Sequence, residues 1–287
     1  MSLRRSVCLL GCVRSVASVA APPRANYAVL QDCDMSFFEK LLGAKKVRTD
    51  DLDPFNKDFL NAYKGTVRSL QTYPEAACGE EGVGGSSKCV LLPGSADEVS
   101  AILRHCYSRN LAVVPQSGNT GLVGGSVPVH DEIVLSLKKL NKNFTFDPHA
   151  GVVQCDAGWI LEELYNRLAP EGYIMPWDLG SRGSCLIGGN ISTAVGGVRR
   201  LRFGSLHNHV LGLQVVLPDE RGTVVNFGSN VRKDNTNLHM HHLFIGGEGQ
   251  LGVVTSVTVC AVPKPSSVQV AMLGNHSVIE FPDFFEG

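Results

Sequence analysis

The chain has 287 residues, of which 44% are hydrophobic and 18% are charged. This length allows one large domain or two smaller ones, and the composition supplies enough apolar material for a sizeable core. The formal net charge of −1 argues against a nucleic-acid partner held by bulk electrostatics.

The first 26 residues have the composition of a targeting segment. They contain no acidic residue and mix Ser, Ala, Val and Leu with four arginines, Arg4, Arg5, Arg14 and Arg24. We predict a mitochondrial transit peptide over residues 1–26, and a matrix location, rather than a secretory signal, because Arg14 interrupts the apolar run. No run reaches the roughly 20 apolar residues that span a bilayer.

The cysteines support a reducing compartment. They are nine in number and scattered, without a Cys-x-x-Cys pair. This pattern disfavours a disulfide framework or a zinc ribbon. We expect reduced thiols that are mostly buried as small apolar groups.

Residues 27–87 are predicted to be an N-terminal segment that ends in a loop. Apolar residues at 37, 38, 41 and 42 have helical spacing, and residues 50–54 indicate a helix start or turn. Residues 71–87 show no hydrophobic period and are predicted to form a loop. A loop of this length is uncommon inside a compact domain.

An ordered pattern of strands and helices begins at Lys88, in a unit predicted over residues 88–150. Strands are expected at 89–92, 111–114 and 132–137. The helix between the first two has apolar residues at i, i+3, i+4 and i+7. Ser95 lies three residues before Glu98, which predicts a capping box, and Asn110 can end the helix.

A glycine-rich stretch, residues 115–126, lies between the last two of these strands. Four glycines within residues 118–125 leave the backbone bare, so successive N–H groups could form a nest for a phosphate or pyrophosphate. A plain turn between strands is the alternative. Rossmann loops and P-loops open directly into a helix. Here a strand follows, which disfavours both kinds of nucleotide site.

A second unit is predicted over residues 151–265, with a strand at 152–155 and an amphipathic helix at 160–168. Two further glycine-rich stretches follow, at 183–197 and 246–252. The remaining strands are expected at 211–217, 223–227 and 253–260. Since each glycine-rich stretch adjoins a predicted strand or helix, the three could converge on one long ligand.

These motifs resemble those of the flavoproteins of the vanillyl-alcohol-oxidase type. The resemblance covers about residues 88–273 and is carried by residues 118–128, 183–190, 232–236 and 243–246. It implies an α+β fold with an FAD-binding PCMH-type domain, in which FAD lies between two α+β subdomains. Within the family, the motifs are most similar to those of dehydrogenases that act on D-2-hydroxyglutarate. D-lactate dehydrogenases share the glycine loops but usually lack the Asn119-Thr120 pair.

The resemblance implies a set of cofactor-binding residues. The first loop would hold the FAD pyrophosphate, the second stretch and the segment before it would line the other half of the site, and the third would lie near the adenine and ribose. The set comprises Pro115, Gln116, Ser117, Gly118, Asn119, Thr120, Gly121, Gly125, Ser126, Pro176, Leu179, Gly183, Ser184, Gly188, Gly189, Asn190, Thr193, Gly197, Glu248, Gly252 and Val253. The first loop has no histidine, which implies non-covalent FAD, and Cys185 is expected to be a packed thiol. Ser117 and Ala194-Val195 depart from the family pattern.

The implied reaction is the oxidation of D-2-hydroxyglutarate to 2-oxoglutarate, with FAD as hydride acceptor and electron-transfer flavoprotein as the next acceptor. The family's zinc ligands are expected in a following substrate domain, which is largely absent, and residues 266–287 are predicted to be only its start. No catalytic or metal-binding residue is assigned here, because the histidines at 239–242 favour a surface helix or loop. A catalytically incomplete FAD-binding fragment and an FAD-dependent D-lactate dehydrogenase are the alternatives.

Overall fold

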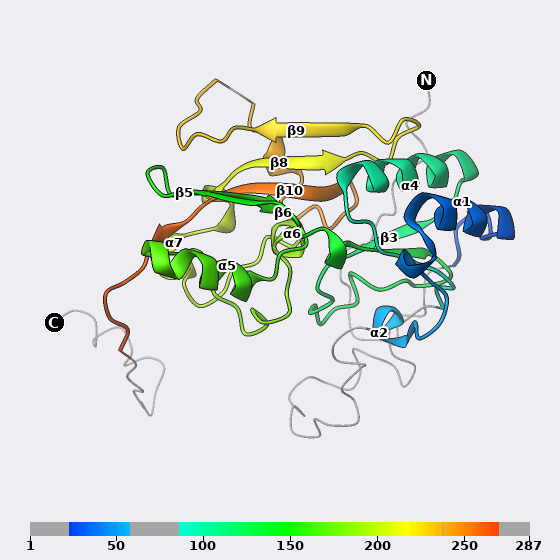
Figure 1. Cartoon of the computed structure of the whole chain (residues 1–287), viewed down its shortest axis with the longest axis horizontal. Helices are drawn as coiled ribbons and strands as arrows, with labels where there is room; N and C mark the ends of the chain where they lie inside the picture. The colour runs from blue at the N-terminus through cyan, green and yellow to red at the C-terminus, as the bar shows by residue number, and fades with distance from the viewer. Residues whose placement is uncertain (1–22, 58–85, 237, 270–287) are drawn as a thin grey trace.

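The computed structural model of the chain describes residues 23–57, 86–236 and 238–269. Most of the predicted transit peptide, most of the 71–87 loop and residues 270–287 lie outside this part. Two larger sheets lie next to each other, with strand orders β1-β2-β4-β3 and β5-β6-β10-β8-β9 (Figure 1). Helices α1 and α4 lie at the end of the molecule formed by the first sheet, and α5 and α6 lie along one face of the second (Figure 1).

The first sheet is mixed. Its strands β2 and β3 run parallel to the central β4, and β1 pairs antiparallel with β2. The three strands predicted from 88 onward are all present, each within two residues of the expected bounds. Residues 117–132, all of them described, connect β3 to β4 without a helix, as the sequence indicated. The elements of this part are α1 (Asp32–Leu42), η1 (Ala44–Lys46), β1 (Val47–Arg48), α2 (Asp53–Asn56), β2 (Val90–Leu91), α4 (Ala96–Arg109), β3 (Val113–Gln116), β4 (Ile133–Ser136) and η3 (Leu137–Lys139).

A buried carboxylate joins α1 to α4. Asp34 is fully buried and accepts hydrogen bonds from His105 Nε2 at 2.9 Å and Arg109 Nε at 2.8 Å. Burial acts to raise the pKa of Asp34, but the bonds from Arg109, His105 and the Gln31 backbone outweigh it and hold the pKa below its usual value. The predicted N-terminal helix is therefore an integral part of the first subdomain.

The N-terminus of α4 is capped, but only half of the predicted capping box forms. The Ser95 hydroxyl accepts from Glu98 N at 3.2 Å. The Glu98 carboxylate accepts from Gly94 N at 2.6 Å and pairs with Lys46 Nζ at 2.9 Å. Asn110 ends the helix in the left-handed conformation, with φ of 55°.

Replacing Ser95 with alanine removes the side-chain acceptor for Glu98 N. We expect the Ser95→Ala protein to lose about 1 kcal/mol of unfolding free energy, measured by urea denaturation. Ser108→Ala on the same helix is the matched control, because the Ser108 hydroxyl bonds the His105 carbonyl from an exposed position. Equal stability of the two variants would contradict a capping role.

The second sheet is antiparallel throughout, and the eight-residue β10 lies at its centre between β6 and β8. Strand β10 has the predicted bounds, and β8 and β9 are shifted by one residue. The sequence did not indicate β5, whose side chains alternate between half-buried and exposed. The strands are β5 (Phe144–Asp147), β6 (Val152–Asp156), β8 (Val210–Val216), β9 (Val224–Gly228) and β10 (Val253–Cys260), and a separate pair is formed by β7 (Tyr173–Ile174) and β11 (Val262–Pro263).

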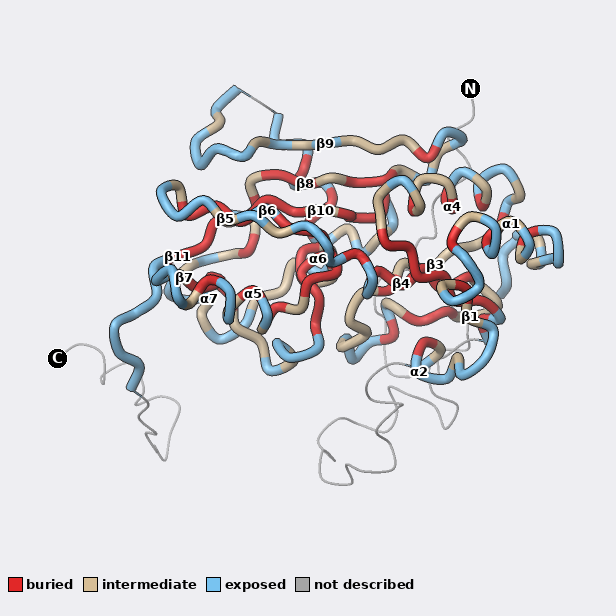
Figure 2. Tube along the Cα trace, viewed as in Figure 1, coloured by how far each residue is buried: buried red, intermediate tan, exposed pale blue. Residues whose placement is uncertain are grey.

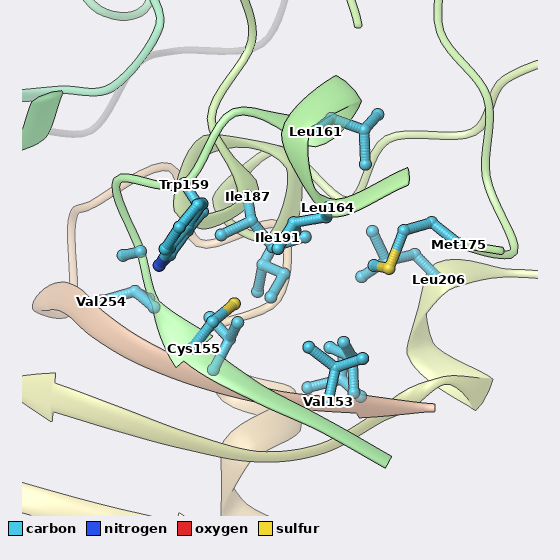
Figure 3. Packing of buried hydrophobic residues seen from close by; sticks show 14 of the residues in the cluster. Val153, Cys155, Trp159, Leu161, Leu164, Met175, Ile187, Ile191, Leu206 and Val254 are labelled. Carbon is cyan, nitrogen blue, oxygen red and sulfur yellow. The ribbon is translucent and has the colours of Figure 1, made fainter. Parts of the chain in front are cut away.

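The main core lies between this sheet and the helices beneath it. Side chains from β6 and β10 meet those of α5 and α6, with Trp159 and Met175 closing two sides (Figure 3). Within the second sheet, the buried residues run along β6, β8 and β10 (Figure 2). The helical segments are α5 (Leu161–Leu168), η4 (Ala169–Glu171), α6 (Ile187–Ser192), α7 (Arg200–Phe203), η5 (Leu206–Asn208) and η6 (Met240–Leu243).

The two subdomains meet in a close-packed junction. The Gly158 amide donates to Leu140 O at 2.7 Å, and a Cβ at Gly158 would lie 2.5 Å from the same oxygen. Asp156 accepts from the amides of Lys142 and Asn143. Strand β5, which lies within the predicted first unit of residues 88–150, pairs with β6 of the second sheet.

Candidate functional site

The first glycine loop leaves β3 and is closed by its own polar side chains. The buried Gln116 donates from Nε2 to Phe55 O and Ser126 O, both at 2.9 Å. Asn119 adopts a left-handed conformation with φ of 53°. Its Nδ2 donates to Lys57 O at 2.8 Å, and its Oδ1 accepts from the Ser126 hydroxyl at 2.7 Å. The loop is thereby fixed to itself, to α2 and to the residue that follows α2.

The second glycine stretch lies directly against the first. A Cβ at Gly118 would lie 2.6 Å from Ser184 O and 2.8 Å from Cys185 Cα, so only glycine allows this approach. The Gly189 amide donates to the Ser117 hydroxyl at 3.1 Å. The two loops therefore touch through their backbones.

The third stretch contacts both of the others. A Cβ at Gly249 would lie 3.1 Å from Pro115 Cγ, and one at Gly125 would lie 3.6 Å from Glu248 Oε2. The Glu248 amide donates to Ser192 O at 2.8 Å. The three stretches thus converge at one place between the two sheets.

The same place gathers unusual backbone conformations. Asn119, Ala194 and Glu248 have φ values of 53°, 47° and 49°, one residue in each glycine-rich stretch. Non-glycine residues rarely adopt such values, and they cluster at ligand sites where the surrounding structure enforces them. This coincidence favours a binding site over three unrelated turns.

The predicted cofactor residues fall into three groups by exposure. Seven are exposed, eight are half-buried, and six are buried. The buried ones lie behind the loops, and Gly252 and Val253 pack within the second sheet, where a Cβ at Gly252 would meet Val215 Cγ1 at 2.7 Å. The exposed residues are Gly121, Gly125, Gly183, Ser184, Thr193, Gly197 and Glu248; the half-buried are Pro115, Ser117, Gly118, Asn119, Thr120, Ser126, Leu179 and Gly189; the buried are Gln116, Pro176, Gly188, Asn190, Gly252 and Val253.

The donor set fits an anionic ligand with a long polar backbone. Asn190 is 3% exposed, and its Nδ2 donor has no hydrogen-bond partner within the geometric limits among the described residues. A Cβ at Gly121 would meet no described atom within 4 Å, so the loop backbone is open on that side. Burial raises the pKa of Cys185. A protonated thiol at the second stretch agrees with a cofactor that is not attached there.

The histidines at 239–242 form a surface segment, as expected, with one exception. His241 is 3% exposed, and its ring lies 4.5 Å from that of His242 and 5.7 Å from that of His239. Burial, and then the charges of His242 and His239, lower the pKa of His241 to about 4. Within residues 23–57, 86–236 and 238–269, no group of three or more His, Cys, Asp or Glu side chains could hold a metal ion. His207 and His209 are hydrogen-bonded to Ser205 and to the Phe203 carbonyl, in agreement with the structural role expected.

The cysteines agree with the sequence analysis. All six that lie in the described part of the chain are free, and five of them are buried. In that same part, no helix combines the length and apolar character needed to cross a membrane.

Comparison with known proteins indicates the kind of domain that the chain contains. A family model described as an FAD binding domain matches residues 87–228. The chain is 47% identical over 270 residues to a probable mitochondrial D-2-hydroxyglutarate dehydrogenase of Oryza sativa subsp. indica, covering 93% of this chain and 44% of that protein. It is 53% identical to mitochondrial D-2-hydroxyglutarate dehydrogenase of Rattus norvegicus, covering 88% and 43%. A putative mitochondrial D-lactate dehydrogenase of Schizosaccharomyces pombe is 44% identical, covering 87% and 45%.

A solved structure shares the fold. An alkyldihydroxyacetonephosphate synthase superposes with a TM-score of 0.67 at 17% identity, covering 91% of this chain and 47% of that one. Residues 87–228 belong to the FAD-binding-domain family of that model, and the superposition shows that the fold is shared. Within that family, its sequence is similar to mitochondrial D-2-hydroxyglutarate dehydrogenases. The α+β fold and the family expected from the sequence are therefore confirmed, and the chain spans a little under half the length of these relatives.

Proposed function

We propose that this chain holds FAD non-covalently in a flavoenzyme that oxidises D-2-hydroxyglutarate to 2-oxoglutarate. The observation that carries the proposal is the convergence of three bare backbone loops, through the Gly118–Ser184, Ser117–Gly189 and Gly249–Pro115 contacts. The matching family model and the relatives that are named for this substrate support it.

Different residues of the chain would contact different parts of FAD. Exposed and half-buried backbone N–H groups of residues 117–121 and 125 would face the pyrophosphate, since an irregular glycine-rich turn can aim several amides at one anion. We assign Asn119 to shaping this loop, because both ends of its amide are engaged within the protein. The residues of the second and third stretches that were predicted from the sequence would line the rest.

Bound FAD would supply the two-electron acceptor that none of the amino-acid side chains can provide. The protein's part is to orient the cofactor and to exclude water around it. The substrate is a small 2-hydroxy acid, and we propose electron-transfer flavoprotein as the acceptor and the mitochondrial matrix as the compartment. The mitochondrial names of the relatives support that compartment. Zinc is expected for the full-length family, and among the described residues no group of three or more His, Cys, Asp or Glu side chains could hold it.

Two alternatives are retained. D-lactate is a possible substrate, because one relative at 44% identity is named for it. The chain could also bind FAD without turning over any substrate, because it spans less than half of each relative.

The full chain, expressed and purified, tests these functions through its flavin absorbance. We expect bound flavin that is released on denaturation, and a rise in melting temperature with added FAD, since a ligand stabilises the state it binds. D-2-hydroxyglutarate and D-lactate are then added separately without oxygen and with Zn²⁺ present. Bleaching by D-2-hydroxyglutarate is the expected result.

The other outcomes separate the alternatives. Bleaching by D-lactate alone would replace the proposed substrate, and bound flavin that neither substrate bleaches would leave the FAD-binding unit as the function. A protein that neither retains flavin nor gains stability from added FAD would contradict the cofactor assignment.

A further inference from the structure

The segment Met175–Leu179 joins β7 to the second glycine stretch without helix or strand structure. Two of its residues, Pro176 and Leu179, are among those proposed to line the FAD site. Its apolar side chains anchor it from below: Met175 is fully buried near Leu164 and Leu206 (Figure 3), and Trp177 is 3% exposed. Anchored side chains do not, however, fix the orientation of an irregular backbone.

The backbone is fixed instead by partners for its carbonyl groups. In a buried segment without secondary structure, each carbonyl needs a partner from elsewhere. The Tyr165 hydroxyl lies 2.6 Å from Trp177 O. The Val198 amide donates to Asp178 O at 3.2 Å, and an Arg199 Nη1–H donates to Met175 O at 3.3 Å.

Arg199 connects all of these partners. Its Nη1 donates to the Tyr165 hydroxyl at 2.7 Å, and its Nη2 lies 3.3 Å from Asp178 Oδ2. Its guanidinium carbon lies 5.3 Å from the centre of the Tyr165 ring. Burial raises the pKa of Tyr165, so its hydroxyl keeps the proton that it donates to Trp177 O while it accepts from Arg199.

Close packing completes the arrangement. Gly197 has φ of 97°, and a Cβ there would overlap Asp178 O, so residues 197–199 lie directly against residue 178. A planar guanidinium can serve a hydroxyl, a carbonyl and a carboxylate at once, whereas a lysine ammonium is a point charge on a flexible stem.

We propose that Arg199 is a positioning residue for FAD, acting through Tyr165 and Asp178 to set the wall formed by residues 175–179. This inference rests on the proposed function, because Pro176 and Leu179 matter to the cofactor only if FAD binds here. Arg199 is not among the cofactor-binding residues predicted from the sequence. Its proposed role does not require contact with the cofactor.

The test compares Arg199→Lys and Tyr165→Phe with Arg167→Lys in the full chain. Arg167 is the matched control, because its guanidinium also stacks on an aromatic ring, that of Trp159 at 4.4 Å, and not on the Tyr165 ring beside residues 175–179. Each protein is titrated with FAD, and the band shape and visible circular dichroism of the bound flavin are recorded. Melting temperature without FAD reports the fold.

We expect Arg199→Lys and Tyr165→Phe to weaken FAD binding about tenfold each, as for the loss of one charge-assisted hydrogen bond. The flavin spectrum should change in both, because the wall against the flavin has moved, whereas Arg167→Lys should match the wild type in both measurements. If the wild type binds no FAD, the proposed function fails. If the wild type binds FAD and both variants show its affinity and spectrum, the inference alone is overturned. Loss of the folded state in both variants would also overturn it, because the role of Arg199 would then be structural.

Discussion

A Gly118→Ala protein is expected to lose most of its FAD affinity while remaining folded. The added Cβ would lie 2.6 Å from Ser184 O and 2.8 Å from Cys185 Cα, and both are backbone atoms that cannot swing aside. The first two glycine stretches must therefore separate. Overpacking of this kind costs about 1–3 kcal/mol, and if FAD binding must reverse the separation, its affinity falls roughly 5- to 150-fold.

The effect is steric rather than conformational, because φ at Gly118 lies outside the left-handed region. This allows a clean control. Gly180→Ala is another glycine-to-alanine change near the second stretch, at a position where an added Cβ meets no described atom within 4 Å and φ is not positive. FAD titration followed by absorbance should show wild-type affinity for Gly180→Ala. Equal affinity of the Gly118 and Gly180 variants would mean that the contact between the loops does not shape the site.

Acidification is expected to destabilise the protein through His241. The pKa of this buried side chain is lowered from 6.5 to about 4. The folded state therefore binds a proton on His241 more weakly than the unfolded chain does. Above pH 6.5 neither state is protonated and the stabilisation is complete. As pH falls from 6.5 towards 4, the unfolded chain gains the proton, and about 3 kcal/mol of unfolding free energy is lost in all.

Replacing the imidazole isolates this contribution from that of the carboxylates, which titrate in part of the same range. In a His241→Gln protein, unfolding free energies from urea denaturation at pH 7 and pH 5 should differ less than in the wild type, by about 2 kcal/mol. His149→Gln changes an exposed histidine in a turn and should follow the wild type. If the curves for His241→Gln and wild type run parallel, His241 does not carry the pH dependence.

Much of the fold could be predicted because its signals are local. The apolar spacing of α4 and α5 and the uninterrupted run of β10 each lie within one element, and the helix cap at Ser95 depends on residues three apart. The glycine-rich stretches were visible in the same way. Because a strand rather than a helix follows the first of them, the order of the elements along the chain is enough to disfavour a Rossmann loop.

The remaining features depend on contacts between distant residues. Helix α6 contains two adjacent glycines, which weaken its intrinsic helix propensity, and it forms because Ile187 and Ile191 are buried in the core. The amide of Asn119 donates to Lys57 O, 62 residues earlier in the chain, a contact that no local pattern indicates. The burial of His241 and the Arg199 contacts likewise arise only when separate segments meet.

The position of β10 has a consequence for how the chain acquires its structure. β5 with β6, and β8 with β9, can pair as local hairpins, but they join into one sheet only through β10, which pairs with β6 about 100 residues earlier in sequence. Pairing over such a separation slows folding, because the entropy of closing a long loop is lost before the contacts form. During synthesis, therefore, the two hairpins cannot join into one sheet until residues 253–260 have left the ribosome. The loop at 246–252 emerges just before that strand, so its contacts with the first two glycine-rich stretches form at the same late step.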